Sequence, residues 1–224
     1  MDISGIEVCI FDVNGVLIDS NAANAAAMAR AFTDDPAIQE RVAEFYLELT
    51  GIDRGEKIRL IQRHVIGKPF GEREFDLRWA NFGRFGRLSM FEAPPTRGSR
   101  EVLAELGARK IRRIALSNTP VVELQEVLTA HRFDSLLDLV RGGGDWPKRE
   151  SLVRLLRELH LDANRCFFVG DGKGDLAAAR YADVSFAAID PGRGEFEGED
   201  GFSGPYRDLI DWGRETFGFR LQSN

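Results

Sequence analysis

Three short segments with strand patterns in this chain each lead into a polar side chain, and this feature constrains the fold most strongly. Residues 6–11 end at Asp12, residues 111–116 end at Ser117, and residues 166–169 end at Gly170 and Asp171. Short apolar runs of this kind are typical of buried strands in a parallel sheet. Ligands of open α/β sheets bind outside the carboxyl ends of the strands. We therefore expect Asp12, Ser117 and Asp171 to meet at one edge of a sheet.

Helical patterns separate the predicted strands in the second part of the chain. We expect helices at 97–106, 120–130, 149–159 and 173–181, alternating with strands at 111–116, 137–140, 166–169 and 184–189. Residues 191–204 are rich in glycine and acidic residues, which predicts a solvated loop before a closing helix at 206–216. Strands that alternate with helices of this length favour an α/β fold with a doubly wound, Rossmann-like parallel sheet.

The segment 16–92 has a different character, because it contains helical patterns and no convincing strand. Helices are expected at 21–32, 36–50, 54–65 and 72–82, followed by a glycine-rich return to the core at 81–87. This arrangement predicts a helical cap domain inserted after the first strand. The cap would comprise residues 16–92, and the catalytic core domain would comprise residues 1–15 and 93–224.

Charge and hydrophobicity exclude several classes of function. The formal net charge of -6 argues against a nucleic-acid partner, whose binding proteins are usually basic. No apolar stretch approaches the ~20 residues that span a bilayer, and residues 1–12 lack the pattern of a signal peptide. We expect a cytoplasmic monomer or homodimer without membrane contact. Cys9 and Cys166 lie in apolar runs and are expected to be reduced core residues.

Four motifs follow one another at the ends of predicted strands or before predicted helices. They are Phe11-Asp12-Val13-Asn14-Gly15-Val16-Leu17, Leu116-Ser117-Asn118-Thr119, Lys148, and Val169-Gly170-Asp171-Gly172-Lys173-Gly174-Asp175. Taken singly, Asp12 or Ser117 is better explained as a helix N-cap. Taken together, the motifs resemble those of the haloacid dehalogenase superfamily, and the match covers the whole chain. The resemblance implies an Mg²⁺-dependent phosphatase that acts on a small phosphorylated metabolite.

The same resemblance implies a role for each motif residue. Asp12 would be the nucleophile that forms an aspartyl-phosphate. The Asp12 carboxylate, the Asn14 carbonyl and Asp171 would bind Mg²⁺, which prefers oxygen ligands. Asp175 lies one helical turn after Asp171 and would be an outer or water-mediated partner.

The remaining motif residues would hold the phosphoryl group. Ser117 and the backbone amide of Asn118 would bind its oxygens, and Lys148 would stabilise the charge that develops on it. The Lys-Pro-x-Pro surroundings usual in the family are absent at Lys148. Arg149 therefore remains an alternative for this role.

Asn14 departs from the family pattern, which has a second aspartate at this position. That aspartate serves as general acid and base, a role that an amide cannot fill. Metal binding would survive, because the family ligand at this position is the backbone carbonyl. Three explanations remain open. In the first, the leaving group needs little protonation, or water or another side chain takes over the role. In the second, the protein is a catalytically impaired relative that binds a phosphorylated ligand or a partner. In the third, the residue was engineered to trap a complex.

The predicted cap resembles that of phosphoglycolate phosphatases and β-phosphoglucomutases. Thr50, Gly51 and Arg54 match their substrate-specificity loop, and a guanidinium can hold a carboxylate or second phosphate of a substrate. A phosphonatase-like activity is an alternative, since that branch also lacks the second aspartate; it needs a cap lysine, and the cap offers Lys57 and Lys68. A phosphomutase is disfavoured, because returning the phosphoryl group to a second hydroxyl depends on the missing acid–base residue.

Overall fold

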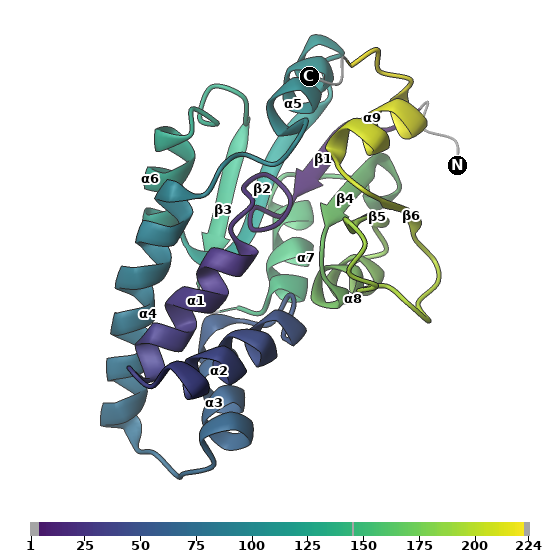
Figure 1. Cartoon of the computed structure of the whole chain (residues 1–224). Coiled ribbons are helices and arrows are strands. Elements are labelled where there is room, and N and C mark those ends of the chain that lie inside the picture. Colours follow the sequence, from purple (N-terminus) through teal and green to yellow (C-terminus); the bar gives the residue numbers. More distant parts are fainter. Residues whose placement is uncertain (1–4, 145, 222–224) are drawn as a thin grey trace.

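The computed structural model describes residues 5–144 and 146–221. Within them, six parallel strands form one sheet in the order β3-β2-β1-β4-β5-β6 (Figure 1). The strands are β1 (Val8–Phe11), β2 (Arg112–Pro120), β3 (Leu139–Gly143), β4 (Cys166–Gly170), β5 (Ser185–Ile189) and β6 (Ser203–Tyr206). The chain leaves β1 for β2 and β3 on one side and returns to β4, β5 and β6 on the other. The topological switch point, where such sheets bind ligands, therefore lies between the carboxyl ends of β1 and β4.

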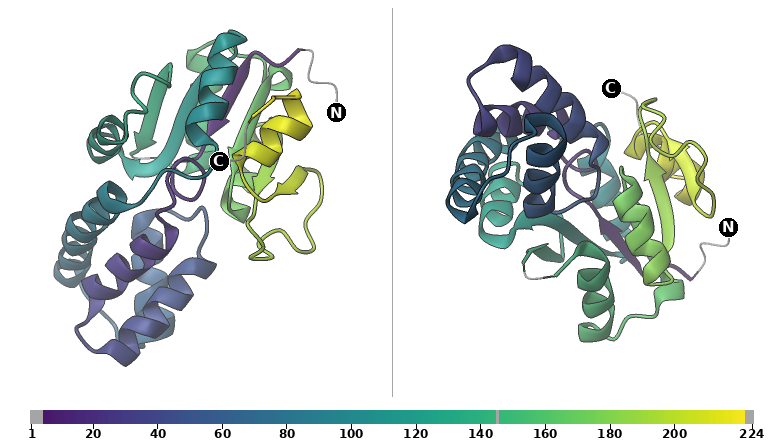
Figure 2. Two further views of the ribbon diagram at one scale, coloured as in Figure 1. Left: turned by 45° about the horizontal axis from the view of Figure 1, so that its top comes forward. Right: turned by 90° about the horizontal axis from the view of Figure 1, so that it is seen from below.

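Helices cover both faces of this sheet, which confirms the predicted doubly wound fold (Figure 2). They are α5 (Ser99–Ala108), α6 (Val121–Ala130), α7 (Lys148–Glu158), α8 (Lys173–Tyr181) and α9 (Leu209–Phe217). β1 is buried on both faces because its side chains alternate between two cores. Cys9 and Phe11 pack with α5, α6 and α9, whereas Val8 and Ile10 pack with α7 and α8. Both Cys9 and Cys166 are buried free thiols, as expected.

The segment between β1 and β2 is helical in the structure. It contains α1 (Asn21–Phe32), α2 (Pro36–Glu48), α3 (Arg54–Ile61), a π-helical turn at Gln62–Ile66, and α4 (Glu72–Glu92). These helices enclose a hydrophobic cluster of their own, with Met28, Val42 and Ile58 at its centre. The helical insertion, residues 16–92, projects from the carboxyl edge of the sheet at the lower part of Figure 1. The exact borders of the predicted cap and core domains stay a prediction.

Two sequence expectations were wrong in detail. The glycine-rich return at 81–87 is absent, because α4 continues without a break to Glu92. Glycine usually favours a turn, but here the contacts of α4 with α1 and α6 outweigh this local preference, and Gly83 lies against the guanidinium of Arg54 inside the helix. The loop predicted at 191–204 ends in β6, an edge strand with Gly204 and Pro205 that local pattern cannot distinguish from a loop.

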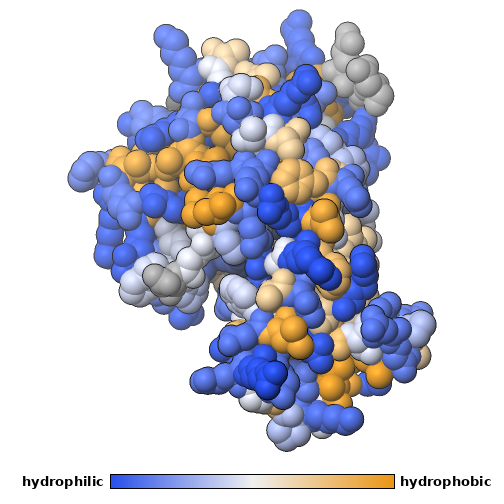
Figure 3. Space-filling model, turned by 90° about the vertical axis from the view of Figure 1, so that its left-hand side faces the viewer, coloured by the Kyte–Doolittle hydropathy of each residue, from blue (hydrophilic) through white to orange (hydrophobic). Residues whose placement is uncertain are grey.

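The face of the molecule seen in Figure 3 is mostly polar. Figure 3 shows a hydrophilic face with small groups of hydrophobic side chains, and its outline narrows where the sheet-containing part meets the helical insertion below. In the part of the chain that the structure describes, no helix has both the length and the apolar character needed to cross a bilayer.

Candidate active site

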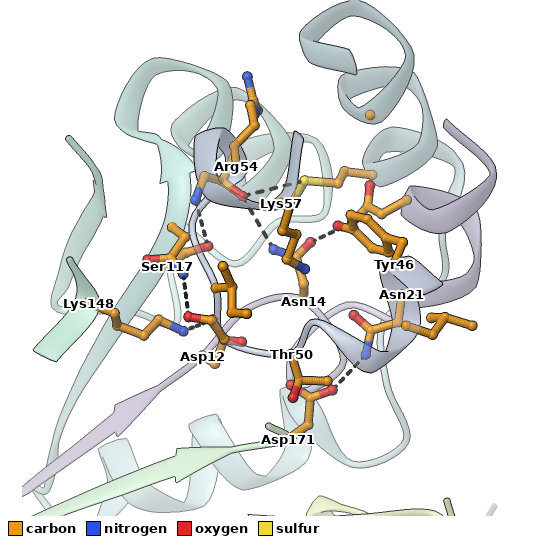
Figure 4. A pocket seen from close by; sticks show the side chains of 18 of the residues that line it. Asp12, Asn14, Asn21, Tyr46, Thr50, Arg54, Lys57, Ser117, Lys148 and Asp171 are labelled. Atoms are coloured by element: carbon orange, nitrogen blue, oxygen red, sulfur yellow. Dashed lines mark hydrogen bonds and ion pairs between the residues drawn. The ribbon is translucent and has the colours of Figure 1, made fainter. Parts of the chain in front are cut away.

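Asp12 lies at the first residue after β1, in the middle of the sheet. Its strand pairs with β2 on one side and β4 on the other, so the ends of three neighbouring strands converge on it. Ser117 lies near the end of β2, and Asp171 follows β4 directly. All three side chains are buried and line one cavity of about 90 Å³ between the sheet edge and the helical insertion (Figure 4). The predicted meeting of these residues is therefore present.

Lys148 joins two carboxylates at the base of the cavity. It is the first residue of α7, and its Nζ lies 2.7 Å from Asp12 Oδ1 and 2.7 Å from Asp175 Oδ1. Burial works to lower the pKa of Lys148, but the two carboxylates outweigh it, and the net pKa is raised above its usual range. Lys148 is therefore a permanent cation at the candidate nucleophile. The alternative residue, Arg149, instead contacts the neighbouring Glu150.

The carboxylates of Asp12, Asp171 and Asp175 form a compact cluster. One oxygen from each lies within 4.8 Å of the others. Asp175 Oδ2 is buried and has no hydrogen-bond partner among the described residues. A bare buried carboxylate oxygen is costly, whereas hard divalent cations prefer such oxygens. The donor set thus fits Mg²⁺.

Gly15 makes this close approach of chain segments possible. It adopts a φ of +82°, and a Cβ at this position would lie 2.1 Å from Asp171 Oδ2. Any other residue would both strain the backbone and displace the Asp171 carboxylate.

The cluster is electrostatically crowded. Burial raises the pKa of Asp12 to about 7; Lys148 opposes this increase, and the carboxylates of Asp175 and Asp171 add to it. Burial likewise raises the pKa of Asp171 to about 6, with a further contribution from Asp175 and opposition from Arg193. The metal-free cluster therefore holds more negative charge than Lys148 and Arg193 neutralise, which would favour a bound cation.

Asn14 is held by three hydrogen bonds that use both ends of its amide. Oδ1 accepts from the Ser20 hydroxyl at 2.7 Å and from Asn24 Nδ2 at 3.0 Å, while Nδ2 donates to Thr119 Oγ1 at 3.3 Å. Ser20 and Asn24 belong to the start of the helical insertion, and Thr119 to β2. The Asn14 side chain is thus fixed at the wall of the cavity, but it has no proton to transfer.

The residues after Ser117 differ from the expected strand–helix junction. β2 continues through Pro120, and its register with β3 shifts between Leu116 and Pro120. Ser117 Oγ accepts a hydrogen bond from the Thr119 amide at 3.2 Å. The Asn118 side chain donates to the Gly51 carbonyl at 3.1 Å, so it also contacts the helical insertion.

The predicted specificity loop closes directly on the glycines of the fourth motif. Gly51, at φ +68°, would place a Cβ only 2.4 Å from the Cα of Gly174, and a Cβ on Gly172 would lie 2.7 Å from the Cβ of Thr50. The Thr50 hydroxyl also hydrogen-bonds the Glu195 carboxylate. The glycines therefore allow the backbone of the insertion to pack closely against the fourth motif, and the insertion closes the cavity on the side opposite the sheet edge.

Arg54 lines the cavity, but its charge is already matched. Its guanidinium binds both carboxylate oxygens of Glu123 on α6, at 2.8 and 3.3 Å, and lies 5.0 Å from the ring centroids of Trp79 and Phe82. Lys57 also lines the cavity, whereas Lys68 is exposed at a separate hollow of the insertion. Of the two lysines considered for this site, only Lys57 is in place.

Comparison with known proteins identifies the family. The sequence model of the haloacid dehalogenase-like hydrolases matches residues 6–183. The chain belongs to the haloacid dehalogenase-like hydrolase family. The matched range contains all four motifs described above.

Individual proteins are similar to this chain along most of their length. A phosphoglycolate phosphatase of Colwellia psychrerythraea is 25% identical over 193 residues, which cover 82% of this chain and 84% of the relative. A predicted phosphatase from Clostridium acetobutylicum has a TM-score of 0.74 at 14% identity, covering 96% of this chain and all of that one. A mutant of CbbY from Rhodobacter sphaeroides, in complex with xylulose-(1,5)-bisphosphate, has a TM-score of 0.69 at 24% identity, covering 88% of this chain and 93% of that one.

The sequence pattern did not predict several residues of this hydrolase site. Asn21 donates to Asp171 Oδ2 at 2.6 Å, and Arg193 contacts the same oxygen at 3.1 Å. The spacing of Asn21 and Asn24 in an otherwise alanine-rich helix was an available signal for polar contacts at the site. Arg193 lies in a glycine-rich loop after β5, where local pattern carries no indication of its partner.

Replacing Lys148 by methionine is expected to destabilise this hydrolase by about 3–5 kcal/mol, because Asp12 and Asp175 would keep buried charges without their shared cation. The measurement is urea unfolding at neutral pH without divalent cations. The exposed Lys173→Met is the matched control, with an expected change within about 0.5 kcal/mol. A loss below about 1 kcal/mol for Lys148→Met would contradict a charge-bridging role.

Proposed function

We propose that this protein is a Mg²⁺-dependent phosphomonoester hydrolase that acts on a small anionic metabolite through an aspartyl-phosphate on Asp12. The observation that carries the proposal is the Lys148 bridge from Asp12 to Asp175, with Asp171 beside it. Family membership and the similarity to a phosphoglycolate phosphatase support the same class of reaction.

The proposed reaction has two displacements at phosphorus. A carboxylate oxygen of Asp12 attacks the phosphoryl group, the bond to the leaving oxygen breaks, and an acyl phosphate forms. Water then attacks the acyl phosphate, releasing inorganic phosphate and the free Asp12 carboxylate. Lys148 keeps Asp12 oriented and offsets negative charge, while the Ser117 hydroxyl lies in the cavity where it can donate to a phosphoryl oxygen.

Asp12 and Asp171, with the backbone carbonyl of Asn14, would hold Mg²⁺, and the bare oxygen of Asp175 adds a buried acceptor next to them. When bound, the ion supplies positive charge that reduces repulsion between the carboxylate and phosphoryl anions. The closed Thr50–Gly51 loop would exclude bulk water from the cavity.

Asn14 sets a limit on the chemistry. Because its amide cannot donate a proton to the leaving oxygen, substrates with acidic leaving groups would react faster than simple alkyl phosphates. The alternative function is a catalytically impaired relative that binds a phosphorylated ligand. Three hydrogen bonds hold the Asn14 amide at the position where the family has its proton donor. This observation favours the alternative, because the amide occupies that position without a proton to transfer.

A panel of phosphomonoesters tests the two functions against each other. The proposed hydrolase releases inorganic phosphate from at least one aryl or acyl phosphate, in a Mg²⁺-dependent way, and carries acid-stable label on Asp12 after quenching. Absence of both turnover and label for every ester, together with tight binding of a phosphorylated compound, would select the impaired relative.

Mg²⁺ is expected to stabilise the protein more at pH 8 than at pH 5.5. Burial raises the pKa of Asp12 to about 7 and of Asp171 to about 6, so the folded protein retains protons that the unfolded chain releases. In the metal-free protein this contribution to stability is complete below about pH 4 and is lost as pH rises to about 7. Mg²⁺ binds the deprotonated carboxylates and restores stability at the higher pH.

At about 100 times its Kd, Mg²⁺ should contribute about 2.7 kcal/mol, which corresponds to a rise in Tm of roughly 5–10 °C at pH 8. Differential scanning fluorimetry measures the shift, and Asp171→Asn is the control that should reduce it. Equal shifts at both pH values, or an undiminished shift in the variant, would argue against this carboxylate cluster as the binding site.

A further inference from the structure

Four cationic side chains line the cavity, and three of them are ion-paired with carboxylates. Lys148 is paired with Asp12 and Asp175, Arg193 with Asp171, and Arg54 with Glu123. The fourth is Lys57. Among the described residues, no carboxylate forms an ion pair with it. The charges of the other three cations are therefore largely neutralised by the protein itself, whereas the charge of Lys57 is not.

The surroundings of Lys57 explain why this charge matters. It lies on α3 of the helical insertion, and its Nζ is 3.9 Å from the centre of the Tyr46 ring. Tyr46, Ile52 and Phe82 also line the cavity, the Tyr46 and Phe82 rings are in contact, and Lys57 is half-buried. Burial lowers the pKa of Lys57 to about 8, although the more distant Asp171 and Asp12 charges raise it. The amine is thus mainly protonated at neutral pH, in a place where water compensates it poorly.

Lys57 faces the cavity from the insertion, while Asp12 and Lys148 face it from the sheet edge (Figure 4). A substrate whose phosphoryl group lies at Asp12 would extend its remaining part toward the insertion. An anionic substituent on that part would meet the one cavity cation, within the described chain, that lacks a carboxylate partner. A neutral substituent would leave Lys57 uncompensated.

We propose that Lys57 selects substrates that carry a second anionic group, a carboxylate or a second phosphate, on the leaving group, which is the part of the substrate that departs from phosphorus. Arg54 instead holds α3 and α4 to α6 through Glu123. This inference rests on the proposed hydrolase function, because it needs the phosphoryl group at Asp12. It also reassigns the charge that selects the substrate from Arg54 to a residue one helical turn further along.

Two substrates of similar size test the proposal. Phosphoglycolate carries a carboxylate, 2-hydroxyethyl phosphate carries a neutral hydroxyl at the same place, and ethylene glycol bisphosphate extends the test to a second phosphate. Lys57→Met should lower the preference for either anionic ester over the neutral one, measured as a ratio of kcat/KM, by about 100-fold. The loss should lie mainly in KM, and Lys57→Arg should recover most of it.

Two further variants separate selection from structure. Arg54→Met should weaken closure of the insertion and lower kcat/KM for anionic and neutral esters by similar factors. Lys68→Met, at an exposed lysine of the same insertion, is the matched control for loss of one positive charge. The inference is overturned if Lys57→Met lowers kcat/KM for all three substrates by the same factor. It is also overturned if the preference for anionic esters is lost in Arg54→Met and kept in Lys57→Met.

Binding measurements keep this test independent of turnover. Calorimetry with the Asp12→Asn variant should show Mg²⁺-supported binding of phosphoglycolate that weakens when Lys57→Met is added. If the protein hydrolyses no ester but shows this Lys57-dependent binding, the hydrolase function fails and the anion site stands. If it hydrolyses the esters without any Lys57-dependent preference, the function stands and the inference fails. If Lys57→Met changes neither the binding of phosphoglycolate nor the preference for anionic esters, the inference is overturned.

Discussion

Asp12→Asn is expected to lower kcat by about 10⁴-fold or more and to abolish the acid-stable phosphoenzyme. A neutral amide is a much weaker nucleophile toward phosphorus than a carboxylate. The substitution preserves size and removes one charge from a crowded buried cluster, so folding should not suffer. Lys148 would still have Asp175 as its partner.

The phosphoenzyme measurement is sharpened by Asn14. Without a general base, the acyl phosphate should hydrolyse slowly and accumulate in the unmodified protein when the ester has an acidic leaving group. Radiolabelled acetyl phosphate followed by an acid quench detects it. Asp19→Asn provides the matched control, because Asp19 is exposed on the same segment. Equal labelling of the Asp12→Asn variant and the unmodified protein would exclude Asp12 as the nucleophile.

Asn14→Asp is expected to raise the rate for alkyl phosphates by about 10²–10⁴-fold, which is the usual contribution of general acid–base catalysis. The site can accommodate the carboxylate. Ser20 and Asn24 already donate to Oδ1 of Asn14, and the Thr119 hydroxyl can rotate to donate to the second oxygen. All three hydrogen bonds would thus be retained.

The diagnostic quantity is the dependence of log kcat/KM on the pKa of the leaving group. The unmodified protein should show a steep decline from aryl to alkyl phosphates, and the Asn14→Asp variant a shallow one, since a protonated leaving oxygen carries less charge. Asn14→Ala removes the amide without adding a carboxylate and should bring no gain. Parallel lines for the unmodified protein and Asn14→Asp would show that residue 14 does not transfer the proton.

The sequence predicted the position of Asp12, Ser117 and Asp171 well because each follows a segment with the pattern of a buried strand. In a parallel sheet, strand ends share one edge, so a local pattern there has a global consequence. The family resemblance added Lys148, whose partners lie far away in the chain. The resemblance also pointed to Arg54, but no local pattern could show that Glu123 already neutralises it.

The missed features depend on contacts rather than on local preference. The helix α4 continues through Gly83 because it packs against α1 and α6, and these contacts are visible only after the helices are packed. Arg193 reaches Asp171 from a loop after β5, and the partner of a long flexible side chain cannot be predicted from its neighbours in the sequence. Such long-range side-chain contacts determine the electrostatics of the site.

The contact between the Gly51 and Gly174 backbones has a consequence for altering substrate range. Closure of the insertion at this point depends on the absence of side chains, so residue identity there is dictated by fit and not by the ligand. Tyr46, Ile52 and Lys57 face the cavity beside it. A mutant library that keeps the glycine pair and randomises those three positions would vary substrate recognition while the contact between the insertion and the core is preserved. The residues that can change the substrate range are thus separate from the residues that hold the insertion in place.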